Sequence, residues 1–441
     1  MSGNTKNSEV VVKNFGKKID LILCVGQILM ESGADTNRIV RTMKRVGVFL
    51  GFTEKSQHIH ITYTTIMLNV TSNDNERTMT KFQKCYRHGI DMTIISAMSK
   101  LSWRAIEENY TLAKFEHDLN FIRQRRRFYA TPITVIGAGV ACGGFSLLFG
   151  CDILAFIYTS ICAMIGFLVR MNCHKLNFNP YASIAISAFT ASYLAYFAHF
   201  LPTSTPWHPL MACALFIVPG VPLINAVDDL LDNFIVSGMT RATNCFLMVV
   251  SMTFGIVLAI KFCNFDFEQF ISVMISPNAF IICVIASAIS AVGFSTLFNT
   301  PPRLLWIVAL GAIISVSIRN FLMAEYGFMQ STASLIGSVI VCVLALKVVH
   351  MVHTPTHVLT IPSVIPLIPG VLIYRFLFSV INIESLSDMS FRQLMQDGVN
   401  ASLIILGITF GVAIPNMFFR KYLNKEKANR LYAIINNRHQ K

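Results

Sequence analysis

From residue 131 onward, the chain consists of apolar stretches of about 20 residues, each as long as a helix must be to cross ~30 Å of hydrocarbon. With 54% hydrophobic and only 13% charged residues, the chain cannot be a soluble enzyme, which needs about a quarter of its residues charged. The sequence predicts an all-α polytopic membrane protein with ten transmembrane helices, at 131–149, 152–171, 180–201, 207–226, 238–262, 279–298, 303–323, 329–351, 358–382 and 399–419.

The basic residues gather at the two ends of the chain. Residues 1–131 hold 20 Lys and Arg against 12 Asp and Glu, and the segment from Arg420 holds 7 against 1. An even number of spans places both ends on one side, and an excess of positive charge marks that side as cytoplasmic. Acidic residues favour the connections on the other side. We therefore expect a multi-pass membrane protein with cytoplasmic termini and without a secretory signal. The eleven scattered cysteines are expected to be buried free thiols.

Several short strings recur in the same order in the two halves of the apolar region. Residues 144–149 (GFSLLF) return as 293–298 (GFSTLF), and 218–221 (VPGV) returns as 368–371 (IPGV). Residues 253–255 (TFG) return as 409–411, and Arg170 returns as Arg319. The ten spans thus divide into two copies of five. Because five is odd, the second copy must be inverted in the membrane, a symmetry typical of transporters that work by alternating access and also found in channels.

The N-terminal region predicts a small soluble α+β domain on the cytoplasmic side. Helical spacing favours helices at 19–30 and 39–50, where Gly33 ends the first and Asp35 or Thr36 caps the second. Residues 58–71 read as one or two strands, and 91–110 and 111–128 as two further helices, the second carrying Arg123, Arg125, Arg126 and Arg127 toward lipid headgroups. The predicted boundaries are 1–128 for this domain, 129–265 and 278–420 for the five-helix repeats, and 421–441 for a basic cytoplasmic tail.

Two Pro-Gly pairs interrupt the fourth and ninth predicted spans at equivalent positions, Pro219-Gly220 and Pro369-Gly370. Proline removes a backbone donor and clashes with the preceding turn, so both helices should break there. Paired breaks at membrane depth point to a transporter's substrate site. The alternative is a pair of structural kinks between packed helices.

Ionisable residues near these breaks are the remaining candidates for the substrate and proton pathway. Asp228 and Asp229 follow the first break, and one of them could exchange the coupling proton, or both could lie in an acidic cytoplasmic loop with Asp232. Arg170 and Arg319 could hold a substrate carboxylate or extend to the interfaces. Arg375, five residues past the second break, ranks beside the aspartates.

Other patterns favour ordinary structural roles. The glycine-rich string 137–143 lies inside an apolar span, where helix packing explains it better than a nucleotide loop. His58 and His60 share a strand face without a third ligand, so no metal site and no cofactor is predicted. His350, His353 and His357 surround a connection; they could relay protons, but a solvated loop accounts for them.

The segment 33–38 (GADTNR), continuing through 42–47 (TMKRVG) to Leu50-Gly51, resembles the opening signature of the threonine/serine exporter family. The chain is also similar to that family in both Pro-Gly motifs and in 301–303 (PPR), over residues 15 to 420. The resemblance implies a bacterial inner-membrane exporter, both halves fused in one chain, that moves small hydroxylated amino acids outward using the proton gradient. Relatives with separate halves are associated with succinate export.

Three hypotheses follow. The first is a proton antiporter exporting threonine, serine or a similar small-molecule substrate through the lipid bilayer by alternating access, either as a single chain or as a homo-oligomer. The second is a dicarboxylate exporter that depends more on the three arginines. The third is a membrane scaffold or sensor acting through its cytoplasmic domain. No nucleophile, base and orienting group stand at a recognisable spacing, and we therefore predict no enzyme and no nucleic-acid partner.

Overall fold

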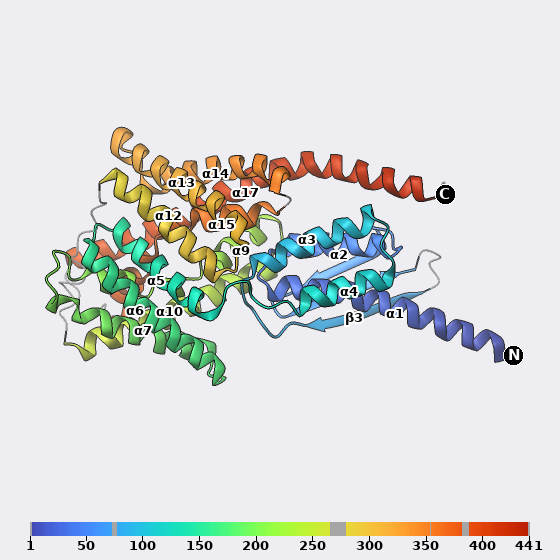
Figure 1. Cartoon of the computed structure of the whole chain (residues 1–441), viewed down its shortest axis with the longest axis horizontal. Coiled ribbons are helices and arrows are strands. Elements are labelled where there is room, and N and C mark those ends of the chain that lie inside the picture. The colour runs from blue at the N-terminus through green and yellow to red at the C-terminus, as the bar shows by residue number, and fades with distance from the viewer. Residues whose placement is uncertain (1, 73–76, 265–278, 353, 382–387, 440–441) are drawn as a thin grey trace.

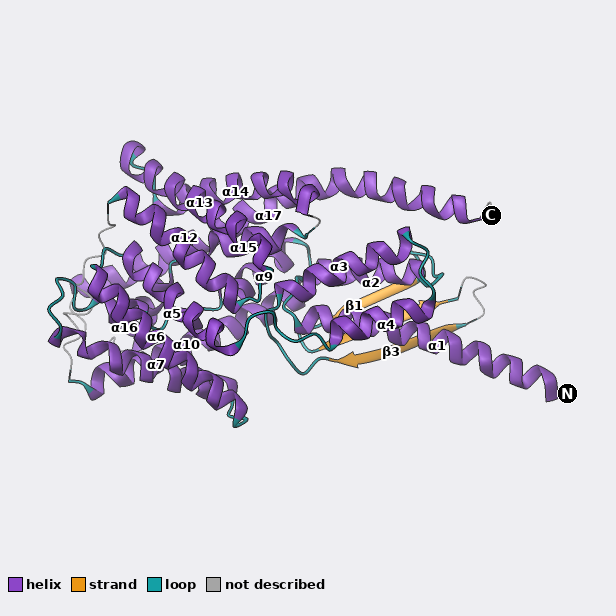
Figure 2. Ribbon diagram, in the orientation of Figure 1, coloured by secondary structure: helices purple, strands orange, loops and turns teal. Residues whose placement is uncertain are grey.

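A computed structural model describes residues 2–72, 77–264, 279–352, 354–381 and 388–439. A helical bundle forms one part of the molecule, and a small domain with the only sheet of the described residues forms the other (Figures 1 and 2). The start of the first helix and the end of the last project from the same end of the molecule (Figure 1). Asp266, Glu268 and Glu384, expected in acidic connections, lie outside the described residues.

The N-terminal domain packs four helices with an antiparallel sheet of order β1-β2-β3. Alternate side chains of the central strand β2 are buried, so one face of the sheet meets the helices while the register keeps polar residues outside. Its core includes four fully buried side chains, those of Ile19, Ile22, Ile66 and Leu68. The elements are α1 (Ser2–Glu31), α2 (Thr36–Phe49), β1 (Gln57–Ile61), β2 (Thr65–Thr71), β3 (Thr78–Lys84), α3 (Met92–Glu107) and α4 (Leu112–Arg123).

Within the described residues, the bundle contains eight helices that are long and apolar enough to cross a membrane, or up to ten spans if two bent helix pairs each count as one. The predicted spans therefore correspond to helices, although only eight are continuous. They are α5 (Thr131–Leu148), α6 (Ile153–Lys175), α7 (Pro180–Tyr196), α10 (Ile235–Phe262), α12 (Phe280–Leu297), α13 (Leu305–Tyr326), α14 (Gln330–Val352) and α17 (Asp388–His439). The segment expected to be a separate tail continues α17 as helix.

Both bent pairs break at the predicted Pro-Gly positions. In the first, α8 (His208–Ala212) and a 3-10 turn lead to Pro219, and α9 (Gly220–Leu231) leaves at 57°. In the second, α15 (Thr356–Val364) and a 3-10 turn lead to Pro369, and α16 (Gly370–Ile381) leaves at 63°. The backbone bonds at the two breaks are the same: Gly220 donates to Val218 and Leu223 to Pro219, as Gly370 donates to Ile368 and Ile373 to Pro369.

Helix packing in the first half recurs in the second. Helix α10 packs on α7 as α17 packs on α14, and α5 meets α12 along the contact between the halves. The repeated glycines explain part of this shared helix packing. A Cβ on Gly255 would lie 2.2 Å from the carbonyl oxygen of Ala185 in α7, and one on Gly411 would lie 2.6 Å from Ser338 Cβ in α14. The same residue thus permits the same close helix contact in each half.

Two local expectations in the N-terminal domain were wrong. Strand β3 was not predicted, because Thr78, Lys81 and Lys84 give it a polar sequence typical of an edge strand. Helix α4 ends at Arg123, so the following arginines are not helical. Arg127 instead donates to the carbonyl oxygens of Ile90 and Leu297, which joins the domain to the end of α12.

Candidate functional site

The acidic pair Asp228 and Asp229 lies in the second limb of the first broken helix. The two side chains are 2% and 1% exposed. They are therefore not part of a solvated loop, the alternative that the sequence left open. Burial of two adjacent carboxylates costs several kcal/mol per ion unless charged or hydrogen-bonding groups compensate it, and the surrounding side chains supply such groups.

Asp229 is held by the N-terminal domain and by α10. The backbone N–H of Thr36 donates to its Oδ1 (2.8 Å) and the Thr36 hydroxyl to its Oδ2 (2.7 Å). The Arg241 guanidinium lies with Nε 3.0 Å from the same Oδ2. Arg241 also donates to the carbonyl oxygen of Ala34 (3.0 Å), so one arginine joins α10, α9 and the domain.

The whole segment 33–38 docks on the end of α9. Gly33 takes a φ of 80°, which turns its carbonyl toward the amide of Asn225 (2.8 Å). Asn37 donates to Asp232 at 2.5 Å. Asp35 caps α2, as one of the two predicted caps, by accepting from the backbone of Arg38. The string that carries the family resemblance is thus the surface by which the domain contacts the end of α9.

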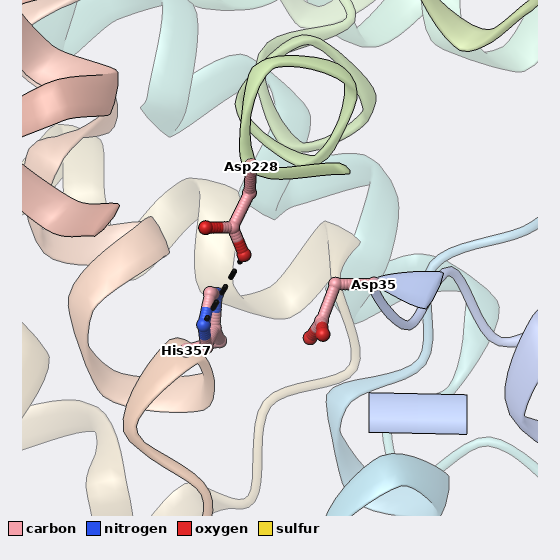
Figure 3. Close-up of side chains that lie close together, drawn as sticks. All are labelled: Asp35, Asp228 and His357. Atoms are coloured by element: carbon pink, nitrogen blue, oxygen red, sulfur yellow. Dashed lines mark ion pairs between the residues drawn. The ribbon is translucent and has the colours of Figure 1, made fainter. Parts of the chain in front are cut away.

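Asp228 faces two other buried residues from different parts of the chain. His357 of α15 places Nε2 3.7 Å from Asp228 Oδ2, and Asp35 lies beside them (Figure 3). One ligand atom from each residue lies within 4.8 Å of the others. His357 is 5% exposed, so the expectation of a solvated histidine loop was wrong for this residue, and His353 lies outside the described residues.

The second broken helix carries an ion pair of its own. Arg375 of α16 is 6% exposed and lies with Nε 3.8 Å from Asp397 Oδ2 of α17. Asp397 stands 156 residues after Arg241, the offset that relates the TFG strings. In each half, therefore, the second limb of the broken helix pairs with the last helix, and the signs of the charges are reversed between the halves.

The two breaks meet at a small apolar cavity. Its lining residues form four pairs at the repeat offset: Phe145 and Phe294, Leu215 and Ile365, Val218 and Ile368, Gly220 and Gly370. The two phenylalanine rings contact each other edge to face at 5.7 Å. Because α9 and α16 both begin at this cavity, the positive ends of two helix dipoles are directed at it.

Arg170 and Arg319 lie apart from these contacts. Arg170 is half-buried in α6, and Arg319 is half-buried in α13, where its Nε donates to Asn320. Among the contacts of the described residues, none joins either arginine to the lining of the cavity or to the aspartates. The structure brings the two Pro-Gly breaks together at the cavity. It places Asp228 and Asp229 elsewhere, where α9 meets the N-terminal domain.

A second junction fixes the domain to the other half of the bundle. Asp91 caps α3 through Ile94 and accepts from Asn299 Nδ2 (2.7 Å), while Thr93 donates to the Asn299 carbonyl. Burial raises the pKa of the Asp91 carboxyl above its ordinary value, against the opposing effect of these hydrogen bonds. The domain therefore contacts both halves, at α9 and at the end of α12.

The chain matches two family models, "Putative threonine/serine exporter" over residues 20–263 and "Threonine/Serine exporter, ThrE" over residues 283–418. The chain belongs to the threonine/serine exporter family. An uncharacterized Haemophilus influenzae protein is 30% identical over 135 residues, which cover 30% of this chain and 45% of that protein. No solved structure matches.

Two further relatives each match about half of this chain. A "Probable succinate transporter subunit YjjP" of Escherichia coli is 24% identical over 54% of this chain and 92% of its own. Its counterpart in Klebsiella aerogenes is 25% identical over 52% of this chain and 88% of its own. The family assignment makes this chain a membrane transport protein whose two halves match two exporter family models.

Proposed function

We propose that this exporter family member moves threonine, serine or similar small zwitterions out of the cell by proton antiport. The single observation that carries the proposal is the cavity at which both breaks meet. Its apolar walls exclude water, and the N-termini of α9 and α16 offer a positive potential to a substrate carboxylate. The proposed setting is the inner membrane, with both termini cytoplasmic.

The paired cavity residues and the recurring helix contacts support an inverted repeat that alternates between two openings. In such a cycle the two charge-reversed ion pairs would act at opposite ends of the transport pathway. Asp229 with Arg241 would fasten one end to the N-terminal domain, and Arg375 with Asp397 would fasten the other. Transport then requires that each pair separates in turn.

Of the two aspartates, Asp228 is the better candidate for the coupling proton. Asp229 is already engaged by the Arg241 guanidinium and by two donors from Thr36. Asp228 faces His357, and histidine is a residue type that serves as a proton relay in proteins.

The test is efflux of labelled threonine from proteoliposomes under an imposed pH gradient. Asp228→Asn should abolish the response to the gradient while leaving threonine exchange, and Glu54→Gln, at an exposed carboxylate of the domain, should match wild type. Unaltered coupled transport in Asp228→Asn would contradict the assignment. The succinate transporter relatives favour a dicarboxylate as the second candidate substrate. Competition by succinate but not by threonine would establish it.

A further inference from the structure

The junction of the N-terminal domain with the two halves contains three buried side chains that suit a metal ion. Asp35 comes from the domain, Asp228 from the first half and His357 from the second (Figure 3). They are 3%, 2% and 5% exposed, respectively. We propose that these three residues form a binding site for a divalent transition-metal cation, which clamps the domain to both halves.

The register of the docked segment builds this site. Thr36 and Asp229 are joined by two hydrogen bonds, and their chain neighbours are Asp35 and Asp228. The bonds therefore set the two carboxylates side by side. Arg38 donates to both oxygens of Asp35, from its backbone at 2.8 Å and from Nε at 2.9 Å, and so orients that carboxylate as the outer groups of a metal site do.

The distances are close to those of a coordinated ion. A tetrahedral ion with bonds of about 2.1 Å holds its ligand atoms roughly 3.4 Å apart. Asp228 Oδ2 and His357 Nε2 are 3.7 Å apart, longer than a hydrogen bond, and all three ligand atoms lie within 4.8 Å of one another. An inward movement of about 1 Å would complete three coordination positions and leave the fourth for water.

The donor set indicates the class of cation. Two carboxylates and one imidazole suit Zn²⁺, Mn²⁺ or Fe²⁺, whereas Mg²⁺ and Ca²⁺ take oxygen ligands. Two carboxylates also balance a charge of +2 in a buried place, where an uncompensated charge would be costly. Because each ligand belongs to a different part of the chain, the ion would hold the three parts together.

Metal binding to tag-free, full-length protein in detergent provides the test, with Zn²⁺ and Co²⁺ as probes. Wild type should bind one equivalent of Zn²⁺ and become more stable to heat. Asp35→Asn, Asp228→Asn and His357→Gln should each weaken binding more than tenfold. The matched control is His208→Gln: His208 is buried at the repeat position 149 residues earlier, and its Nε2 meets the carbonyl oxygen of Phe149.

A ligand exchange separates loss of a ligand from loss of folding. His357→Cys should restore binding and give a thiolate-to-Co²⁺ charge-transfer band that wild type lacks. Absence of stoichiometric Zn²⁺ in wild type, unchanged affinity in His357→Gln, or an equal loss in His208→Gln would overturn the proposal. Binding is measured without substrate, so its failure leaves the transport proposal standing, and failure of transport leaves the metal site standing.

Discussion

Thr36 donates two hydrogen bonds to Asp229, a residue 193 positions later in the chain. The backbone N–H and the hydroxyl each donate to one carboxylate oxygen. The first turn of α2 therefore behaves as a binding site for an anionic side chain. This contact places the N-terminal domain directly on the broken helix. In the proposed transport cycle, movement of α9 would therefore strain, shift or release the domain.

The hydroxyl of Thr36 can be removed with little change of shape by Thr36→Val. A hydrogen bond to a charged group contributes about 2 kcal/mol, so local opening of residues 33–38 should become roughly 30-fold more frequent. Amide hydrogen exchange of residues 33–38 measures the frequency of this opening. Thr42→Val, at a buried threonine of the same helix, should leave the exchange of residues 33–38 unchanged. Equal effects of the two variants would show that Thr36 contributes only packing.

Close helix contacts at the repeated glycines give a second prediction. Gly255→Ala and Gly411→Ala each place a methyl group against backbone or Cβ atoms of the neighbouring helix. Overpacking of this kind costs about 1–3 kcal/mol, so both variants should unfold at lower temperature in detergent. In Gly16→Ala the new Cβ meets only the end of Lys81, at 3.6 Å, and helix propensity predicts no loss. Normal stability of both bundle variants would contradict the packing argument.

Asp91 predicts a dependence of stability on pH. Burial raises the pKa of this carboxyl in the folded protein, so the folded state binds more protons than the unfolded state between the two pKa values. The resulting stability is fully present below the unfolded pKa and is lost as pH rises through the folded one. As pH falls from 7 to about 4, the unfolding temperature of wild type should therefore rise relative to that of Asp91→Asn, which lacks this carboxyl. Glu54→Gln, at an exposed carboxylate, should keep the wild-type response.

The parts of this structure that depend on local sequence could be predicted. Spans follow from the length of apolar stretches, the breaks from Pro219-Gly220 and Pro369-Gly370, and the cap of α2 from Asp35. Each of these is decided by the chemistry of a residue and its near neighbours. Strand β3 was missed because an exposed edge strand carries little apolar alternation.

Pairing across the chain could not be predicted in the same way. Nothing local to Thr36 indicates Asp229, and nothing local to His357 indicates Asp228 or Asp35, because tertiary packing sets those contacts. The sequence does contain one signal of such pairing, a reversal of charge between equivalent positions of the two halves. Arg241 and Asp397 occupy equivalent repeat positions with opposite charge, so a search for identical residues passes over them, whereas a search for reversed charges finds them.

The proposed inversion of the two halves predicts opposite exposure for a matched pair of loop residues. Phe178 follows α6 and Phe328 follows α13, 150 residues later, and the two side chains are 51% and 44% exposed. If the halves are inverted, Phe178 lies on the cytoplasmic side and Phe328 on the other. Single Phe178→Cys and Phe328→Cys variants should then react with a membrane-impermeant maleimide from opposite sides.

Labelling is best measured in a Cys24→Ser, Cys263→Ser background, since these are the half-buried cysteines of the described residues and the others are buried. Phe328→Cys should label in right-side-out vesicles and Phe178→Cys in inside-out vesicles. The background protein alone, treated from both sides, controls for native thiols. Labelling of both variants from one side would mean that the halves share an orientation, and the alternating cycle of the two ion pairs would then lose its basis.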